Sequence, residues 1–346
     1  MASVVSDAIP RVHAMNAARA TTIWIALGAA CVCVLVASLA MGSVALPVSR
    51  ALGALFHMHA ATPDIADDIV LTLRLPRALA GFASGALLAT AGALLQVLLR
   101  NPLAEPYVLG VSGGAAAFAL AAMLASLPWW SVDIAACAGA LASIVLVLGL
   151  ARGDVWRSGQ DASPRLLLTG VVIASGWGAL ITLMLSIAPE NRLRGMIFWL
   201  TGDLNGAAAP WPALAALAVV LLAIVPAAPQ LNVLLRGDAA AQSLGVPVAR
   251  LRLRVYLVAS LAAAAAVTTA GTIGFVGLVV PHLLRLAFGN DQRMLVPAAA
   301  LAGGLAVMAA DLAARTVIAP AQLPVGVVTA LIGVPMFLWM LLGRPR

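Results

Sequence analysis

The chain has 346 residues, of which 63% are hydrophobic and only 10% are charged, and its net charge is +7. Soluble domains carry about 25% charged residues, so this composition excludes one and indicates a polytopic membrane protein. All 20 basic residues are arginine. A chain without lysine has no phosphate-binding loop of the GxxxxGK[ST] type, which excludes an ATP site of that kind.

Uncharged apolar runs between charged residues predict ten membrane-spanning helices. The run 255–284 is too long for one upright helix of about 20 residues. Gly271 and Gly274 favour a break in it, which gives a seventh span and a shorter eighth that ends near Arg285. The other predicted spans are 22–44, 76–99, 107–126, 132–150, 166–187, 211–228, 296–316 and 324–342. The predicted fold class is therefore an all-α, multi-pass membrane protein.

The arginines are distributed unevenly between the two sides of these spans. If the amino terminus is cytoplasmic, the opposite side keeps only Arg50, Arg74, Arg77, Arg192, Arg194 and Arg315. Positively charged loops stay in the cytoplasm, so both termini are predicted to lie there. Trp129 and Trp130 then fall at the outer interface, where aromatic belts lie.

The second span is predicted to lie at the centre of the bundle. Its residues from Ala78 to Leu99 carry no charge and are mainly Ala, Leu and Gly. Gly81, Gly85, Ala89 and Gly92 recur at spacings of three or four and form a small-residue face on which neighbouring helices can pack closely. Pro76 lies near its first turn and Pro102 follows its end, so both ends are marked.

Two blocks of motifs resemble one known family. The first block comprises RLPR at 74–77, Gln96 near the end of the following helix, RNPLAEP at 100–106 and LGVSGGA at 109–115. The second comprises GTIGFVGLVVPHLLR at 271–285, LPVG at 323–326 and GVP at 333–335. With LTGDLNGA and QSLGV between them, these motifs are similar in order and spacing to FecCD/BtuC-type permease subunits of bacterial ABC importers for iron-siderophores, haem and cobalamin.

The resemblance implies a multi-pass permease of the bacterial inner membrane, with residues 1–21 as a cytoplasmic tail and 22–343 as one transmembrane permease domain. It implies a transport subunit and not an enzyme, without cofactor or bound metal. The expected partners are two copies of an ABC ATPase subunit that hydrolyses ATP, a periplasmic substrate-binding protein, a second copy of the chain and membrane lipid, but no nucleic acid. The expected substrate is an iron chelate, siderophore or haem, with cobalamin as the alternative.

The segment 229–254 is a candidate for coupling to the ATPase. Asp238 can begin a short helix that Gly245 ends, and Pro247 can begin another. In the resembled family the coupling helices that dock on the ATPase lie here, which implies roles for Arg236, Gly237, Asp238, Leu244 and Gly245. The alternative is a solvated basic connector.

Arg74, Arg77 and Arg315 end predicted spans on the outer side. In similar transporters, arginines at these positions form salt bridges with glutamates of the periplasmic binding protein, for which the planar guanidinium is suited. The alternative is that these side chains only extend to the lipid headgroups.

Two cytoplasmic turns are expected to gate the pathway by resemblance. They contain Asn101 and Leu103 after the second span, and Ser163 and Pro164 before the fifth. Pro164 departs from the small hydroxyl residue expected of a cobalamin importer. Both turns have an alternative interpretation as helix caps.

Other polar residues are given structural interpretations. Asp311 lies inside the ninth predicted span, where a carboxylate is a candidate for a proton relay, but without a second acid nearby we expect it to bond to a neighbouring helix. His282 is expected to be buried or to cap a helix, and Cys31, Cys33 and Cys137 to be buried. His57 and His59 are expected to be incidental, although such a pair can contact haem or metal.

Two rival classes remain open on the residues alone. An ion-coupled secondary transporter predicts paired ionisable residues near the membrane midplane and broken helices in both halves, and neither is clear in the sequence. An intramembrane aspartyl protease needs two convergent acids within spans, whereas Asp133 lies near the start of the fourth span and only Asp311 is deep.

Overall fold

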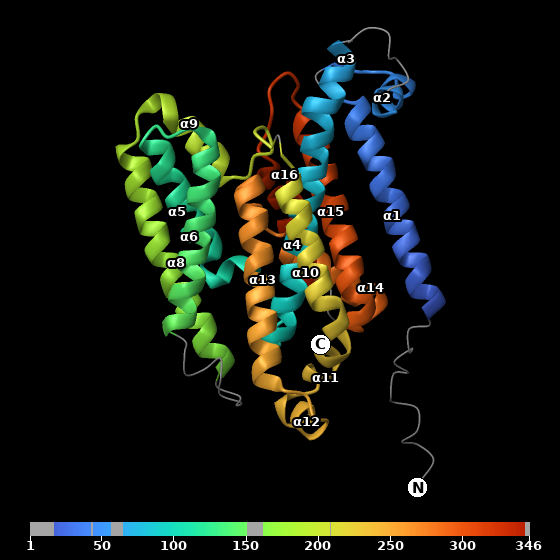
Figure 1. Ribbon diagram of the computed structural model, residues 1–346, viewed down its shortest axis with the longest axis vertical. Helices are drawn as coiled ribbons and strands as arrows, with labels where there is room; N and C mark the ends of the chain where they lie inside the picture. Colours follow the sequence, from blue (N-terminus) through green and yellow to red (C-terminus); the bar gives the residue numbers. More distant parts are fainter. Residues whose placement is uncertain (1–16, 43, 57–64, 151–161, 208, 343–346) are drawn as a thin grey trace.

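The computed structural model describes residues 17–42, 44–56, 65–150, 162–207 and 209–342, and over these residues the chain is helical with no strand (Figure 1). A helix lies on each of the ten predicted spans. They are α1 (Ala17–Ala40), α4 (Leu75–Leu98), α5 (Val111–Leu124), α6 (Trp129–Leu150), α8 (Ala162–Ile187), α10 (Trp211–Ile224), α13 (Val248–Ala270), α14 (Val276–Phe288), α15 (Gln292–Thr316) and α16 (Val325–Leu342).

Seven helical stretches within the described residues are long and apolar enough to cross a membrane. Helices α5, α14 and α16 are apolar but shorter. The all-helical membrane fold is therefore confirmed, whereas the number of ten spans and the side on which the termini lie stay predictions. The predicted amino-terminal tail falls mostly outside the described residues, because α1 begins at Ala17.

Short helices lie at the two ends of the bundle. At one end are α2 (Val48–Leu55), α3 (Ile65–Asp68) with η1 (Ile69–Arg74), and α9 (Glu190–Leu200) (Figure 1). At the opposite end are α11 (Ala228–Leu234), after η3 (Val225–Ala227), and α12 (Asp238–Ser243). We call these the α9 end and the α12 end.

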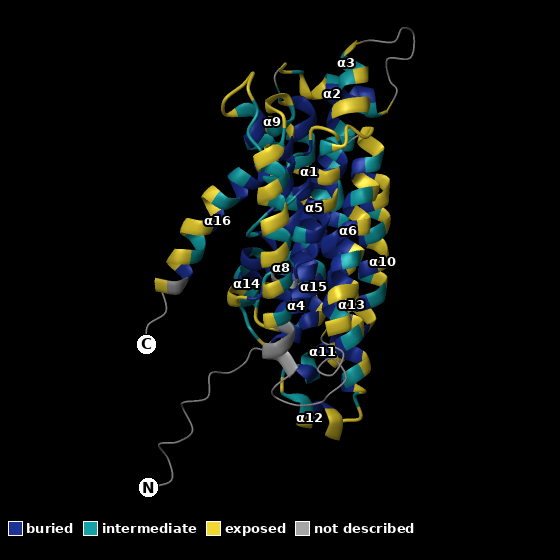
Figure 2. Cartoon of the chain, turned by 90° about the vertical axis from the view of Figure 1, so that its left-hand side faces the viewer, coloured by how far each residue is buried: buried dark blue, intermediate teal, exposed yellow. Residues whose placement is uncertain are grey.

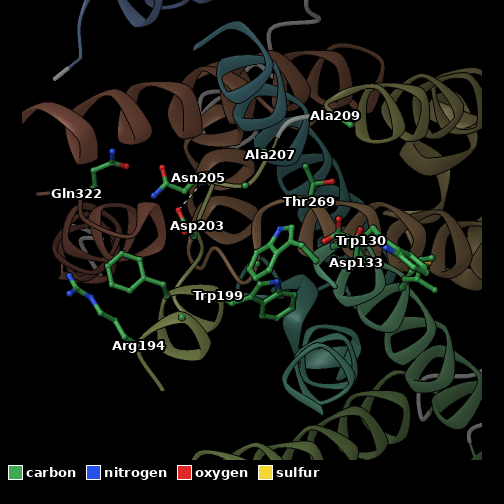
Figure 3. Close-up of a pocket in the computed structure, with 18 of the residues that line it drawn as sticks. Trp130, Asp133, Arg194, Trp199, Asp203, Asn205, Ala207, Ala209, Thr269 and Gln322 are labelled. Carbon is green, nitrogen blue, oxygen red and sulfur yellow. Dashed lines mark hydrogen bonds between the residues drawn. The ribbon is translucent and has the colours of Figure 1, made fainter. Parts of the chain in front are cut away.

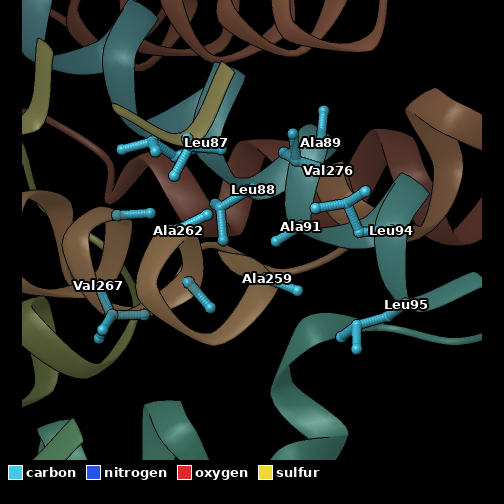
Figure 4. Close-up of a cluster of buried hydrophobic side chains, with 14 of the residues drawn as sticks. Leu87, Leu88, Ala89, Ala91, Leu94, Leu95, Ala259, Ala262, Val267 and Val276 are labelled. Carbon is cyan, nitrogen blue, oxygen red and sulfur yellow. The ribbon is translucent and has the colours of Figure 1, made fainter. Parts of the chain in front are cut away.

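Helix α4 forms the core, as its composition predicts. Every residue from Ala83 to Leu98 is buried, and α10, α13, α14 and α15 pack around it. Figure 4 shows Leu87, Leu88 and Ala91 of α4 against Ala259 and Ala262 of α13. The contacts are close because Gly85 lies on the backbone of Gly303 in α15, and Gly92 lies on the backbone of Gly277 in α14. Such small-residue contacts are how helices associate where lipid removes the hydrophobic driving force.

The remaining helices lie around this core in two groups. Helices α5, α6, α8 and α9 form a group beside α13, and α1 packs along α15 (Figure 1). Helix α16 leaves the bundle and is exposed along much of its length (Figure 2). Helix α8 is also mostly exposed, so two apolar helices lack protein neighbours over large faces.

The short helices α5 and α14 begin inside the bundle. The first turn of α14 lies beside Leu88 and Gly92, in the interior of α4. Between α4 and α5, the Tyr107 hydroxyl donates to the Ile273 carbonyl at 2.9 Å and accepts from the Ile273 N–H at 2.7 Å. Glu105 accepts from the Phe275 N–H at 3.1 Å. These bonds satisfy irregular backbone, which is tolerated within a membrane only when buried in protein.

The contact between α4 and α14 generates a prediction about stability. A methyl group at Gly92 would overlap the Gly277 carbonyl, so Gly92→Ala is expected to lower stability by about 1–3 kcal/mol through overpacking. Thermal unfolding of the purified protein in detergent measures this. Gly176→Ala on α8 is the control, because no atom lies within 4 Å of the added methyl group. Equal midpoints for the two variants would contradict close packing at Gly92.

Candidate functional site

A buried ion-pair cluster lies at the α9 end of the core. Asp311 of α15 is 1% exposed and accepts from Arg77 of α4, with Nη2 at 2.8 Å and Nε at 3.0 Å from Oδ1. Arg315 lies one turn further along α15, with Nε 3.1 Å from Asp311 Oδ2. Asp311 thus bonds to a neighbouring helix, and the predicted structural role is confirmed.

The three arginines expected to bind a partner are engaged inside the chain. Nη1 of Arg74 donates to the carbonyls of Leu39 at 2.6 Å and Ala40 at 3.0 Å, at the end of α1. Arg315 donates to the Ser38 hydroxyl at 2.6 Å. The guanidinium groups of Arg74, Arg77 and Arg315 are therefore bonded within the chain. The docking role of Arg74, Arg77 and Arg315 stays a prediction.

A large cavity opens beside this cluster (Figure 3). The cavity has a volume of about 1050 Å³, and α6, α9 and α13 contribute to its lining. Trp130 and Asp133 of α6 lie on one side and Arg194 of α9 on another, with Trp199 between them. Asn205 and Gln322 also line it, and both accept from Nη1 of Arg77, at 2.6 and 3.0 Å. The cavity thus adjoins the cluster through Arg77 and combines aromatic, cationic and anionic groups.

A second, more open groove of about 550 Å³ follows one face of α16. It is mainly apolar, with hydroxyls at Thr201 and Thr272. Gly326 lets the start of α16 lie close to the end of α9, because a side chain at this position would overlap the Thr201 carbonyl. Leu331 and Val334 line the groove and are exposed. This face can bind a further apolar surface.

The α12 end has the helix-turn-helix predicted for the coupling segment. Helix α12 begins at Asp238, after Gly237 with φ of +113°, and the chain turns at Gly245 with φ of +77°. Pro247 then precedes α13. Both glycines have positive φ values that other residues rarely adopt. Arg236 and Leu244 are exposed, whereas Asp238 is paired with Arg100 and with Arg252, whose Nη2 lies 2.8 Å from its Oδ2. The structure therefore confirms the local fold, and its role in coupling stays a prediction.

The turn predicted to form the first gate lies next to this segment. Asn101 Oδ1 accepts from the Leu103 N–H at 2.9 Å, and Leu103 is exposed. Such an Asn side-chain bond stabilises a tight turn. Ser163 and Pro164 lie in the first turn of α8, but their side chains, like His57 and His59, fall outside the described residues.

Several minor expectations have mixed outcomes. His282 is buried in α14 and Cys31 in α1, as expected. Cys33 and Cys137 are exposed, so their predicted burial is wrong. A small apolar residue that faces lipid instead of a neighbouring helix has the same sequence signal as a core residue. No group of three metal-binding side chains is found in the part of the chain that the structure describes.

Sequence reasoning missed several polar partners of the functional residues. Arg252 pairs with Asp238, and Asn205 and Gln322 extend the Asp311 cluster. Glu105 was noted only as part of a motif, and Tyr107 only as the start of a predicted span. The one available signal was the placement of Arg252 on the otherwise apolar face of α13.

Removal of the Asp311 carboxylate tests the cluster. The variant Asp311→Asn leaves Arg77 and Arg315 buried without their anion, and breaking a buried pair costs about 3–5 kcal/mol. We expect a lower midpoint of thermal unfolding in detergent. The exposed carboxylate Asp133 has no ion pair among the described residues, so Asp133→Asn is the matched control and should change the midpoint little. A stable Asp311→Asn protein would show that the cluster does not support the fold.

Comparisons with known proteins agree with this architecture. The chain is 43% identical over 288 residues to the cobalamin import system permease protein BtuC of Halobacterium salinarum, covering 82% of this chain and 75% of that protein. It is 40% identical over 283 residues to the vitamin B12 import system permease protein BtuC of Salmonella arizonae, covering 80% and 84%. A solved inward-facing metal-chelate type ABC transporter superposes with a TM-score of 0.80 at 27% identity, covering 94% of this chain and all of that one.

The model of the FecCD transport family matches residues 30–343, nearly the whole chain. This match agrees with the motif blocks at 74–115 and 271–335, which lie together around α4 and α14 in the fold. The chain therefore belongs to the FecCD transport family and is the permease subunit of an ABC importer.

Proposed function

We propose that this permease imports cobalamin across a bacterial inner membrane into the cytoplasm. The observation that carries the proposal is the identity of 43% and 40% to two cobalamin permeases, over most of their lengths. These relatives favour the cobalamin alternative over the iron chelate that was expected first. In this proposal ten spans cross the membrane, both termini are cytoplasmic, and the α12 end faces the cytoplasm.

The pathway is proposed to lie between two copies of the chain. Helix α16 exposes Leu331, and α8 exposes a stripe with Ser175, Thr182 and Ser186 at helical spacing. Hydroxyls on an otherwise apolar exposed face are better placed along a polar pathway than against lipid tails, although each also bonds to a carbonyl of its own helix. A second copy that covers α16 would close this pathway.

The α12 end is proposed to dock on the ATPase subunits. Arg236, Leu244 and Gly245 are exposed there, and Leu244 is 65% exposed, as a docking side chain requires. Gly237 and Gly245 set the turns on either side of α12. The gate turns with Asn101, Leu103, Ser163 and Pro164 would open and close as the ATPase pair binds and hydrolyses ATP, which is a shift between two states.

The α9 end is proposed to receive a periplasmic binding protein. For Arg74, Arg77 or Arg315 to meet acidic groups of this partner, their guanidinium groups must first leave Asp311 or backbone carbonyls. Arg77 is the most accessible, because its side chain is 11% exposed and adjoins the large cavity. Docking would therefore rearrange the cluster.

Reconstitution tests the substrate. The permease in proteoliposomes, with its ATPase and binding protein, is expected to take up cobalamin only with ATP, and ATP hydrolysis should rise with cobalamin-loaded binding protein. Ferric siderophore and haem in the same assay are the controls. Uptake of either compound in place of cobalamin would overturn the proposed substrate, and uptake without ATP would overturn the proposed importer.

A pair of leucine variants tests the second copy. Leu331→Asn on α16 and Leu222→Asn on α10 place the same amide at positions 68% and 76% exposed. If α16 is covered by a second copy, only Leu331→Asn should convert the purified dimer to monomer in native mass spectrometry. A dimer that tolerates both changes, or loses stability equally with both, would exclude α16 as the interface.

A further inference from the structure

Helix α12 has one side toward the solvent and one toward the bundle. Gln242 and Leu244 are exposed, whereas Ala241 is buried and the Asp238 side chain is only 14% exposed. A residue that docks on another subunit must be reachable from outside. Asp238 is therefore poorly placed to touch an ATPase, although its segment is well placed to do so.

The Asp238 carboxylate instead joins three elements of the permease. Its Oδ1 pairs with Nη2 of Arg100, directly after α4, and its Oδ2 lies 2.8 Å from Nη2 of Arg252 in α13. Arg252 is buried, so this part of the pair is shielded from water and screened little. Without the carboxylate, the cations of Arg100 and Arg252 would lie close together with no anion between them, which is unfavourable. The Asp238 carboxylate therefore holds Arg100 and Arg252 strongly.

Arg100 also directly precedes the predicted gate turn, which begins at Asn101. The φ of +47° at Arg100 places a non-glycine residue in the left-handed region, where a helix more often ends with glycine. Such strained residues persist only where their surroundings hold them, and they cluster at switching sites. Here the pair with Asp238 holds the Arg100 side chain.

The gate turn is held at its far end as well. Glu105 and Tyr107 bond to the backbone of Phe275 and Ile273, just before α14. Phe275 in turn lies against Gly333 of α16. The turn between Arg100 and Tyr107 is thus connected on one side to α12 and on the other to the helices that border the groove along α16.

From these contacts we infer that Asp238 is a positioning residue that transmits movement of α12 to the gate turn through Arg100. The inference rests on the proposed function, since it requires that α12 docks on an ATPase. It divides the coupling segment into exposed residues that face the ATPase, such as Leu244, and one inward residue that moves the gate.

The test compares coupling in variants of the reconstituted complex. Asp238→Asn should lower the number of cobalamin molecules moved per ATP hydrolysed by about tenfold, a size typical of coupling between sites. ATPase binding should persist, because the exposed face of α12 is unchanged. Asp238→Glu should restore part of the ratio, and Arg100→Gln combined with Asp238→Asn should be no worse than Asp238→Asn alone. Asp67→Asn is the control, because it removes an acid paired with Arg50 at the opposite end.

A distance measurement gives a readout that a merely structural role would not change. Spin labels replace the exposed residues Leu103 and Gln242 in a chain whose three cysteines have been substituted. With Asp238 present, the distance between the two labels should be the same in the ATP-free and the ATP-bound complex. In Asp238→Asn, this distance should differ between the two complexes.

Three outcomes would overturn the inference. They are an unchanged transport ratio in Asp238→Asn, additive losses in the double variant, and a label distance that is the same in both chains and both states. Failure of the proposed function is distinguishable, because the unmodified chain would then move no cobalamin. In that case, the label distances in the complex with the ATPase would still show whether Asp238 connects α12 to the gate turn.

Discussion

Close backbone contact along α4 is the constraint on which the rest of the structure depends. Gly85 and Gly92 let the backbones of α15 and α14 approach without an intervening side chain. In a membrane this contact supplies packing that hydrophobicity cannot, because lipid tails are as apolar as leucine. Helices α10, α13, α14 and α15 pack directly against α4, and most of the remaining helices pack against these four.

Each end of this central helix carries an arginine that pairs with an acid on another element. Arg77 pairs with Asp311 at the α9 end, and Arg100 pairs with Asp238 at the α12 end. In the proposed function, the α9 end meets the binding protein and the α12 end meets the ATPase. Between these two pairs, every residue of α4 from Ala83 to Leu98 is buried, so the helix connects the two ends through a closely packed core.

The break before α5 is the one that the sequence did not indicate, whereas Gly271 and Gly274 predicted the break before α14. An ion-coupled secondary transporter predicts broken helices in both halves, and short helices do begin inside both halves of this chain. Tyr107 and Glu105 satisfy the backbone at these breaks. Broken helices alone therefore do not separate the two transporter classes, and the family match does.

The sequence by itself determined where the apolar helices of the bundle lie, because charged residues separate uncharged runs that are about as long as a membrane-spanning helix. It also determined the turns around α12, since glycine and proline restrict the backbone locally whatever surrounds them. Motif order was sufficient to indicate the family. The substrate was less well determined, since the motifs are shared by permeases for several chelates.

Only the tertiary structure decided which charges meet. Arg77 and Asp311 are 234 positions apart, and Arg100 and Asp238 are 138 apart, so no local pattern pairs them. The face of a helix that meets a neighbour likewise decides whether a side chain is buried or exposed. It decides this for the buried Arg74, the exposed Cys137 and the inward-facing Asp238. On helices that are apolar on every side, periodicity does not distinguish a face in contact with protein from a face in contact with lipid.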